Sequence, residues 1–341
     1  METAHAQPPR WRLAIAAVYL GTVLMSWVVL SGCGTSPAEK TPLTIGVPRE
    51  PLGALLAVAA GQDFFSDEGL NVTLVGDYPS GKRALAGMLD GEVELTAASE
   101  VPVVFRSMER GDFRIVATIG TSDNEPKIVA RADRGIRQPT DLAGRHVATQ
   151  RASAVHYYLH LFMLRHGLSD KVGEISFMNA EQLPAALADG EIDAFSMREP
   201  YVGEAQQRLG ENAVVFSEPG LYVKTFNVVV REDAVRDQPQ AVRAVLRALI
   251  RAEDFAREYP QEARRTVCEQ LDMDAAAVEA AWSQIQLRVL LGQDLITLME
   301  DEADWAIDNQ FVESGQAPNY LEFIEVDPLK EVRPDRVTVV H

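Results

Sequence analysis

The sequence predicts an α/β fold in two lobes that are joined by two chain crossings, with a helical C-terminal tail that packs on the first lobe. Three observations support this prediction. Short apolar runs alternate with stretches of helical periodicity from Leu43 onward, and an acidic motif at residues 90–94 recurs at 189–193. Beyond Glu232 the apolar spacing is that of helices alone. These patterns together predict two similar lobes and a separate helical segment.

The first lobe begins with a regular alternation of strand and helix patterns. Apolar runs at residues 43–47, 72–75 and 93–97 have the length of buried strands, whereas residues 52–65 and 81–89 have helical periodicity. Helices that connect successive strands produce parallel strands, with helices on both faces of the sheet. The first lobe is therefore predicted to contain a parallel sheet.

A sequence motif that occurs twice predicts a second lobe similar to the first. Asp-Gly-Glu-Val-Glu at 90–94 is followed by Glu100, and Asp-Gly-Glu-Ile-Asp at 189–193 is followed at the same spacing by Glu199. In each copy a strand is expected to lead into a helix that begins near the later glutamate. The repeat can reflect a common plan of the two halves or convergence on a common βα element. Both explanations predict two α/β lobes.

Two polar segments mark the places where the chain crosses between the lobes. Residues 121–124 and 224–227 each adjoin β-like runs, and two crossings imply a hinge. The helical region after Glu232 follows the return crossing directly. It is therefore expected to cover the first lobe.

The composition excludes several classes of protein. The chain has 341 residues, enough for two compact units, and 47% of them are hydrophobic. Its 50 acidic residues outnumber 32 basic residues and give a formal charge of −18. This balance argues against nucleic acid as a partner and against an anionic membrane surface. With only 2 cysteines, the chain is not a disulfide scaffold.

An apolar segment near the amino terminus predicts export. Residues 13–30 are almost uncharged, follow Arg10 and Arg12, and run directly into Leu-Ser-Gly-Cys at 30–33. This order resembles a bacterial lipoprotein signal with its lipobox. The alternative is an uncleaved anchor helix, because about 18 apolar residues are just enough to span a bilayer.

The lipoprotein resemblance implies that residues 1–32 are a signal peptide and that Cys33 becomes the lipidated amino terminus. Residues 33–42 are polar, lack apolar periodicity and are expected to form a tether. Cys268 then has no cysteine partner, and we expect it to be a small buried hydrophobe. The mature protein would be exported and anchored to a membrane by lipid, on the periplasmic side or at the surface of a Gram-positive cell.

Six short strings occur in the order found in a known family. They are Phe-Phe-Ser-Asp-Glu-Gly-Leu at 64–70, Ser-Gly at 80–81, Ser-Glu-Val-Pro at 99–102, Asp-Leu-Ala-Gly-Arg-His-Val-Ala at 141–148, Glu-Pro-Tyr at 199–201 and Pro-Asn-Tyr at 318–320. Across residues 43–325 the chain thereby resembles the NMT1/THI5-like type II periplasmic binding proteins, which serve ABC importers of the sulfonate, taurine and nitrate group. The family usually has Trp where this chain has Arg198, so an aromatic wall is missing or replaced by a cation.

The resemblance implies two Rossmann-like lobes joined by a two-crossing hinge. Residues 43–123 and 227–341 would form lobe 1, and residues 127–222 would form lobe 2. A small-molecule ligand would be trapped when the lobes close. The resemblance also implies a monomer without cofactor or metal, which delivers its ligand to an ABC permease and a separate ATPase.

Candidate ligand-binding residues lie where strands end and helices begin. In open α/β sheets, ligands bind outside the carboxyl ends of strands, where helix starts offer free N–H groups and partial positive charge. Tyr201 and Phe226 are the preferred aromatic walls, with Tyr157 or Tyr158 as the alternative. The predicted ligand-binding set is Glu50, Ser99, Glu100, Ser122, Ser153, His156, Arg198, Glu199, Tyr201, Phe226 and Asn227.

Several of these residues have structural alternatives that the sequence leaves open. Ser153 would donate to a ligand or serve as a helix N-cap, and His156, one turn later, would face the cleft or hydrogen-bond locally. Ser122 and Asn227 flank the hinge, where they would reach a ligand or serve the turn itself.

The charged candidates leave the ligand class open. Glu100 and Glu199 at helix starts would be stabilised by the helix dipole whatever the ligand is. If both faced the cleft, they would favour an amine or a nitrogen heterocycle such as an aminopyrimidine. Arg198, with Arg151 and Lys224 as further cations, would instead bind an oxyanion.

The sequence carries no signature of an enzyme. It contains no phosphate loop, no paired Cys or His at metal spacing and no G-x-S-x-G elbow. We therefore expect a solute-binding lipoprotein of an ABC importer, which captures a small oxyanion-bearing compound of the sulfonate, taurine or nitrate type between two closing lobes. The alternatives are the same fold binding a nitrogen heterocycle, and a ligand-sensing lipoprotein partnered with a signalling protein.

Overall fold

The computed structural model describes residues 40–313 and 315–340. The predicted signal peptide (1–32), the lipidation site at Cys33 and most of the tether lie outside these residues. Within the described ranges, no helix has the length and apolar character needed to cross a membrane.

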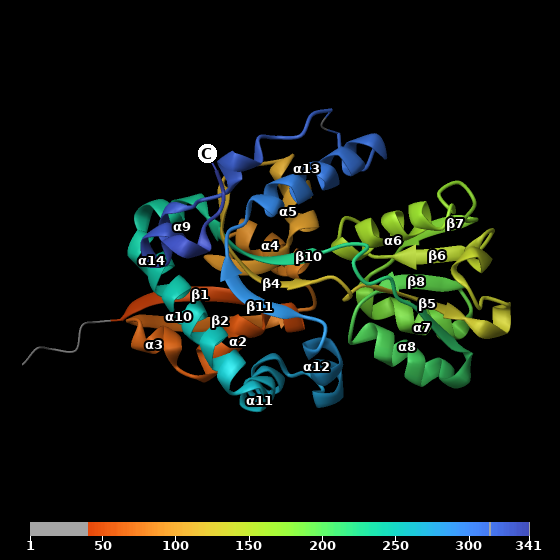
Figure 1. The fold of residues 1–341 in the computed structure, drawn as a ribbon, viewed down its shortest axis with the longest axis horizontal. Coiled ribbons are helices and arrows are strands. Elements are labelled where there is room, and N and C mark those ends of the chain that lie inside the picture. The colour runs from red at the N-terminus through yellow and green to blue at the C-terminus, as the bar shows by residue number, and fades with distance from the viewer. Residues whose placement is uncertain (1–39, 314, 341) are drawn as a thin grey trace, which may run out of the picture. The chain divides into compact units, whose positions relative to one another are not determined.

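Lobe 1 is built on a six-stranded sheet with the order β11-β4-β10-β3-β1-β2 (Figure 1). Its strands are β1 (Thr41–Pro48), β2 (Leu70–Tyr78), β3 (Leu95–Ser99), β4 (Phe113–Ser122), β10 (Lys224–Arg231) and β11 (Gln286–Leu290). β1 is parallel to β2 and β3, as predicted, whereas β10 is antiparallel to β3 and β4. This reversal arises because β10 returns from lobe 2 through the hinge and not through a helical crossover.

Two boundaries in lobe 1 differ from the prediction. β1 begins inside the predicted tether, because backbone pairing continues beyond the apolar run and the Thr41 N–H donates to the Gly69 carbonyl at 3.0 Å. The helix predicted at 52–65 is formed as η1 (Pro51–Gly53), α2 (Ala54–Gly61) and α3 (Phe64–Asp67), and Asp63, with a left-handed φ of 58°, separates α2 from α3. A left-handed residue cannot continue a right-handed helix.

Lobe 2 is built on a five-stranded sheet with the order β7-β6-β8-β5-β9. Its strands are β5 (Lys127–Arg131), β6 (His146–Thr149), β7 (Glu174–Phe177), β8 (Ala194–Met197) and β9 (Ala213–Phe216). β6 is parallel to β7 and β8, and β5 is antiparallel to β8 and β9. Figure 1 shows helices on both faces, namely α6 (Ala154–Arg165) on one and α7 (Leu183–Asp189) with α8 (Tyr201–Leu209) on the other.

The repeated acidic motif occupies equivalent positions in the two lobes. In lobe 1, Gly91 has a φ of 85° and the chain continues into β3 and α5 (Glu100–Ser107). In lobe 2, Gly190 has a φ of 81° and the chain continues into β8 and α8. Left-handed φ values favour glycine, which explains its presence in both copies. A helix begins at Glu100 as predicted, and α8 begins two residues after Glu199.

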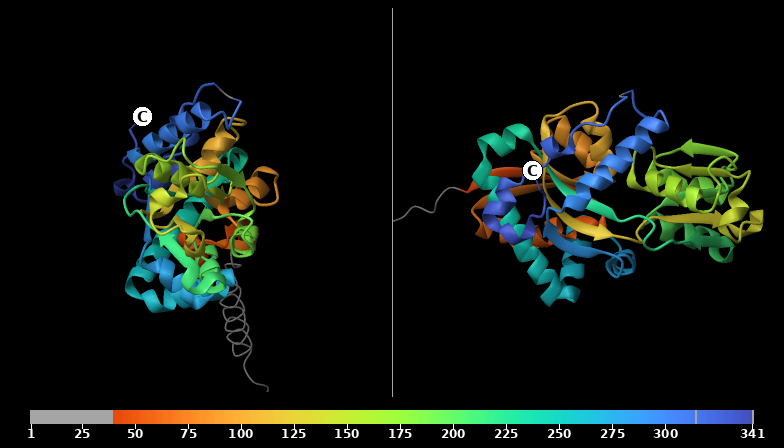
Figure 2. Two further views of the ribbon diagram at one scale, coloured as in Figure 1. Left: turned by 90° about the vertical axis from the view of Figure 1, so that its right-hand side faces the viewer. Right: turned by 45° about the horizontal axis from the view of Figure 1, so that its top comes forward.

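The C-terminal tail packs on lobe 1 but is not wholly helical. Its helices are α9 (Glu232–Asp237), α10 (Pro239–Glu258), α11 (Pro260–Leu271), α12 (Ala275–Trp282), α13 (Gln293–Asp308) and α14 (Asp327–Val332). Between α12 and α13, β11 adds an edge strand beside β4. α13 lies beside α5 and also reaches toward α6 of lobe 2 (Figure 2). There the Trp305 ring centroid is 4.8 Å from that of His156. The tail therefore contacts both lobes.

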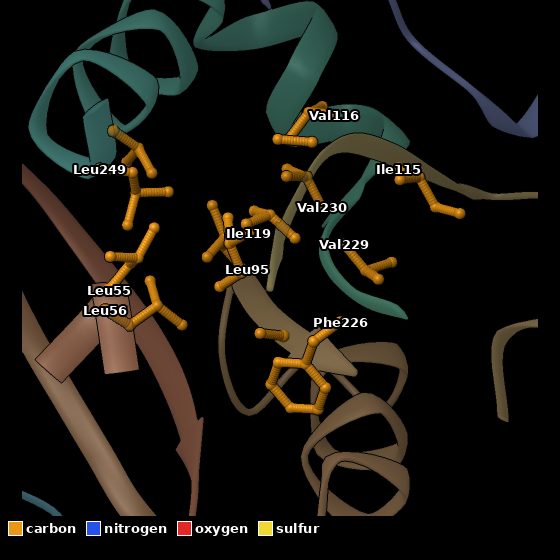
Figure 3. Close-up of a cluster of buried hydrophobic side chains, with 14 of the residues drawn as sticks. Leu55, Leu56, Leu95, Ile115, Val116, Ile119, Phe226, Val229, Val230 and Leu249 are labelled. Atoms are coloured by element: carbon orange, nitrogen blue, oxygen red, sulfur yellow. The ribbon is translucent and has the colours of Figure 1, made fainter. Parts of the chain in front are cut away.

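The core of lobe 1 holds the sheet, α2 and α10 together. Leu55 of α2, Leu249 of α10 and Leu95 of β3 lie in one cluster with Phe226, and none is more than 1% exposed (Figure 3). This burial is the main stabilising contribution to the lobe and fixes the strand ends on which the site is built. Cys268 on α11 packs against the edge of this core and is only partly buried, contrary to the expectation of full burial.

Candidate functional site

A small cavity lies between the lobes, at the carboxyl ends of strands from both sheets. Its walls come from the ends of β1, β3, β6 and β8 and from the starts of α4 (Gly81–Leu89), α5 and α6. The lining residues are Glu50, Ser80, Lys82, Ser99, Pro102, Gln150, Ser153, Ala154, Val155, Met197, Arg198 and Lys224. Its volume of about 20 Å³ leaves room for about one water molecule. The lobes are therefore closed on each other at this point.

Four buried charged side chains form a network beside this cavity. Oε1 of Glu50 is 2.6 Å from Nη2 of Arg198, and Oε2 of Glu50 is 3.1 Å from Nζ of Lys224. The same Nζ is 2.5 Å from Oε2 of Glu125. None of the four residues is more than 7% exposed, and their two positive and two negative charges balance. Because Glu50 belongs to lobe 1 and Arg198 to lobe 2, their ion pair joins the lobes.

The ion pairs keep this network ionised. Burial alone would raise the pKa of Glu50, but the positive charges of Arg198 and Lys224 outweigh it and hold the pKa well below its ordinary value. Burial likewise opposes the charged form of Lys224, and the nearby carboxylates reverse this effect and raise its pKa. Glu50 and Lys224 are therefore both charged at neutral pH.

The start of α4 supplies a backbone donor to the same carboxylate. Ser80 is the N-cap of α4, and the Gly81 N–H donates to Oε1 of Glu50 at 2.8 Å. A Cβ at position 81 would lie 2.9 Å from Cα of Ala98, so glycine is needed for α4 to approach β3 this closely. A helix start with free N–H groups is a place where anions bind. Here the side chain of Glu50 occupies that place.

Two of the predicted serines line the cavity. Ser99 precedes α5 and Ser153 precedes α6, and neither side chain caps its own helix. The hydroxyl of Ser153 donates instead to the Gln150 carbonyl at 2.5 Å. The side-chain N-cap that was the alternative role of Ser153 is therefore not formed. With Glu50 and Arg198, these serines are the predicted residues that the structure gathers around the cavity.

Glu100 is fully buried and lies outside the cavity lining. Its Oε2 accepts hydrogen bonds from the N–H of Thr225 at 2.9 Å and from the Thr225 hydroxyl at 2.7 Å, and the Tyr222 hydroxyl donates to its Oε1. Burial nevertheless raises the pKa of Glu100 to about 7. Oε1 of Glu302, from α13, is 3.3 Å from the same Tyr222 hydroxyl. Glu100 is thus one member of a buried carboxyl pair.

The turn at 199–201 supports the site without lining it. Oε2 of Glu199 accepts a hydrogen bond from the Gly203 N–H at 3.0 Å, which is the helix-start role that the sequence left open. Tyr201 is 9% exposed, and its ring centroid is 5.9 Å from Cζ of Arg198. The tyrosine ring therefore packs near the arginine that reaches the cavity.

Two predicted ring side chains lie elsewhere. His156 packs among aromatic rings, with centroids 4.9 Å from Phe177 and 4.8 Å from Trp305. Burial lowers the pKa of His156 to about 3, so it is neutral at physiological pH. Phe226 is fully buried in the core of lobe 1, because its ring packs from β10 against η1 and the start of α4, and it does not line the cavity.

The two predicted hinge residues bond to the protein itself. The Thr118 hydroxyl donates to Oδ1 of Asn227 at 2.7 Å inside the sheet. The Ser122 hydroxyl donates to the Gln284 carbonyl at 2.7 Å. Ser122 also has the turn role that was its alternative, since its hydroxyl oxygen accepts a hydrogen bond from the Asn124 N–H at 3.2 Å. Asn227 serves no turn, because it lies inside β10, and neither residue lines the cavity.

Sequence reasoning missed Lys82, Gln150 and Glu125 as parts of the site. The Ser-Gly string at 80–81 was the available signal for Lys82, since the first turn of a helix that faces a cleft carries side chains into it. Nothing in the sequence indicates that Glu125 pairs with Lys224, which lies 99 positions away.

The fold and the cavity together define a class of protein, namely a two-lobed α/β binding protein of the type II periplasmic kind. The NMT1/THI5-like family model matches residues 52–263. The chain therefore belongs to the NMT1/THI5-like family.

Relatives and solved structures agree with this assignment. A candidate aliphatic sulfonates-binding protein of Bacillus subtilis is 24% identical over 289 residues, which cover 81% of this chain and 86% of the relative. The alkanesulfonate-binding protein SsuA of Xanthomonas axonopodis bound to MOPS has a TM-score of 0.70 at 19% identity, over 85% of this chain and 100% of that one. The nitrate-binding protein NrtA of Synechocystis has a TM-score of 0.67 at 12% identity, over 87% and 89%. The structural likeness shows a shared fold.

Proposed function

We propose that this protein is the solute-binding component of an ABC importer and that it captures a small oxyanion-bearing compound of the sulfonate, taurine or nitrate type. One observation carries the proposal. Cations from both lobes meet at the cleft, where Arg198 and Lys224 bind the carboxylate of Glu50 and where Lys82 and Arg151 line the adjoining space. These are the donor types that bind oxyanions. The relatives named for sulfonate and nitrate binding support the same ligand class.

Capture works by closure of the two lobes. The ion pair between Glu50 and Arg198 spans the lobes, and Nζ of Lys82 donates across to the Arg151 carbonyl at 2.6 Å. A ligand that contacts both lobes binds the closed form more tightly than the open form and shifts the equilibrium toward closure. The protein releases the ligand chemically unchanged, since its role is binding and delivery.

The transport partners follow from this role. The closed, loaded protein delivers its ligand to a permease that is driven by a separate ATPase. A lipid anchor at Cys33 holds the monomer on the outer side of the membrane, which keeps it near the permease.

Replacing Cys33 by alanine is expected to abolish lipidation and to release the protein from the membrane, because the acylated cysteine would be its anchor. Incorporation of labelled palmitate and the intact mass of the mature protein measure this outcome. Cys268→Ala is the matched control and should retain the label. A wild-type protein that is unlabelled and begins at residue 1 would contradict the anchor.

A ligand screen by thermal shift tests the proposed function. A soluble form of residues 40–341, which make up one compact unit, is expected to gain stability with alkanesulfonates, taurine or nitrate. A ligand present at about 100 times its Kd contributes about 2.7 kcal/mol when it binds only the native form. Stabilisation by aminopyrimidines or other nitrogen heterocycles alone would contradict the oxyanion class. An absence of stabilisation by any of these compounds would contradict solute capture.

A further inference from the structure

A second, larger pocket adjoins the small cavity and is strongly basic. Its volume is about 400 Å³, and its lining includes Lys82, Arg83, Arg106 and Arg151 but no acidic residue. The first three come from α4 and α5 of lobe 1, and Arg151 follows β6 in lobe 2. Lys82 and Gln150 line both spaces, so the pocket and the cavity are neighbours.

The lining of this pocket is positively charged, whereas the chain as a whole carries a net negative charge. The chain has 50 acidic and 32 basic residues, so a pocket with four cations and no carboxylate departs from its overall balance. Lys82 and Arg83 also occupy the first turn of α4, which contains no acidic residue. The helix dipole disfavours cations at that end, and a bound anion would reverse this penalty.

Most of these cations have no acidic partner in the part of the chain that the structure describes. Arg106 pairs with Glu109 at 2.6 Å, in an exposed position at the C-terminal end of α5. Across residues 40–313 and 315–340, no ion pair involves Lys82, Arg83 or Arg151. Burial and the positive charges of three neighbouring arginines lower the pKa of Lys82 to about 8. The electrostatic surroundings of Lys82 are therefore positive.

Arg151 is held in place by aromatic rings and by its backbone. Its Cζ lies 5.4 Å from the ring centroid of Phe177 and 5.7 Å from that of Phe311. The next residue, Ala152, has a left-handed φ of 53°, a conformation that is costly for a residue other than glycine and is concentrated at ligand-binding sites. In this conformation the carbonyl of Arg151 accepts a hydrogen bond from Lys82. The side chain of Arg151 lines the pocket.

The small inner cavity is poorly suited to an added anion. Its donors, the Gly81 N–H, Arg198 and Lys224, already bind Glu50. The buried network is neutral, so a further negative charge would be unpaired there. A volume of about 20 Å³ also excludes a sulfonate unless Glu50 is displaced.

We propose that the anionic group of the ligand binds in the basic pocket of Lys82, Arg83, Arg106 and Arg151, and that the ligand is an organic oxyanion with an apolar part. This inference rests on the proposed function and specifies its ligand class and site. A pocket of about 400 Å³ is much larger than nitrate, and Phe177 supplies an apolar wall for a carbon skeleton. Because the cations come from both lobes, the anion completes its contacts only in the closed form.

Binding of benzenesulfonate to the mature, full-length lipoprotein in detergent tests this site by titration calorimetry. Lys82→Gln and Arg151→Gln are each expected to weaken binding by about tenfold, because each removes one charge-assisted contact. Their melting temperatures should remain near that of the wild type, since both side chains are at least partly exposed. Nitrate, which is too small to reach Phe177 and the cations together, should bind more weakly than benzenesulfonate.

Arg208→Gln is the matched control, because it removes a positive charge from an exposed pair with Glu204 that lies outside the pocket. It should bind benzenesulfonate like the wild type, and an equal loss in this variant would overturn the pocket as a specific site. If Lys82→Gln and Arg151→Gln retain full affinity and Arg198→Met loses it, the anion binds in the inner cavity. That result would overturn this inference and leave the proposed function intact. A wild-type protein that binds neither benzenesulfonate nor nitrate would contradict both.

Discussion

Replacing Arg198 by methionine should open the lobes and lower the melting temperature. Arg198 and Glu50 form an interlobe ion pair at 2.6 Å, and neither is more than 4% exposed. Removal of one partner from a buried ion pair costs about 3–5 kcal/mol, and here the network of Glu50, Glu125 and Lys224 would be left with one net negative charge in a medium of low dielectric constant. Lobe opening would bring Glu50 into water and relieve this cost. Small-angle scattering should therefore show a larger radius of gyration, and a thermal melt should show the loss of stability.

The double variant Glu50→Gln/Arg198→Met is the control for this result. It removes both charges and leaves Lys224 paired with Glu125, so it should recover most of the stability and the compact form. A single variant with the melting temperature and radius of gyration of the wild type would show that the ion pair does not hold the lobes together.

Replacing Glu302 by glutamine should stabilise the protein at pH 8 and have little effect at pH 4. Burial, followed by the nearby Glu100, raises the pKa of Glu302 well above its ordinary value. Its Oε2 has no hydrogen-bond partner among the described residues, whereas Glu100 accepts several hydrogen bonds. We therefore assign the proton to Glu302. Glutamine resembles the protonated acid and carries no charge at any pH.

The sign of the pH dependence follows from these raised pKa values. A carboxyl group whose pKa is higher in the folded state contributes its full stability below the unfolded pKa, and this contribution is lost as the pH rises through the folded pKa. For Glu100 the loss extends from about pH 4.5 to about pH 7 and amounts to about 3 kcal/mol. Glu302 adds a loss at higher pH, which Glu302→Gln removes.

Melting temperatures of wild type and Glu302→Gln between pH 4 and pH 8 measure this difference. Glu300→Gln is the matched control, because Glu300 lies on the same helix α13 and is exposed. Its profile should follow that of the wild type. Parallel profiles for Glu302→Gln and the wild type would show that Glu302 does not carry the buried proton.

Local sequence patterns predicted the lobes well, because they report on burial and helical periodicity. The strand and helix alternation after Leu43 and the repeated glycine motif both correspond to real elements. The direction of β10 was not predictable, since strand direction depends on the path of the returning chain. The break at Asp63 was also missed, because Asp tolerates a left-handed φ without requiring it.

Residues at the ends of strands were easier to assign to the cavity than residues within strands. Glu50, Ser99, Ser153 and Arg198 line it because strand ends and helix starts face the cleft. Phe226, by contrast, lies within β10, which is covered on both faces. The alternation of side chains along β10 assigns Phe226 to one of the two faces of the sheet, but both faces are buried. The sequence alone does not show which side chains of such a strand are directed toward the cleft. Pairing across 99 positions, as between Glu125 and Lys224, leaves no local trace.

The contact of α13 with lobe 2 has an energetic consequence for the transport cycle. When the hinge opens, Trp305 must separate from the rings of His156 and Tyr157, which lie 4.8 Å and 5.1 Å from it. Separation would expose aromatic surface to water, and that exposure is unfavourable. The apolar contact therefore favours the shut form before any solute arrives. Solute binding needs to supply only the remainder of the closing free energy, and the permease must overcome both contributions to empty the receptor.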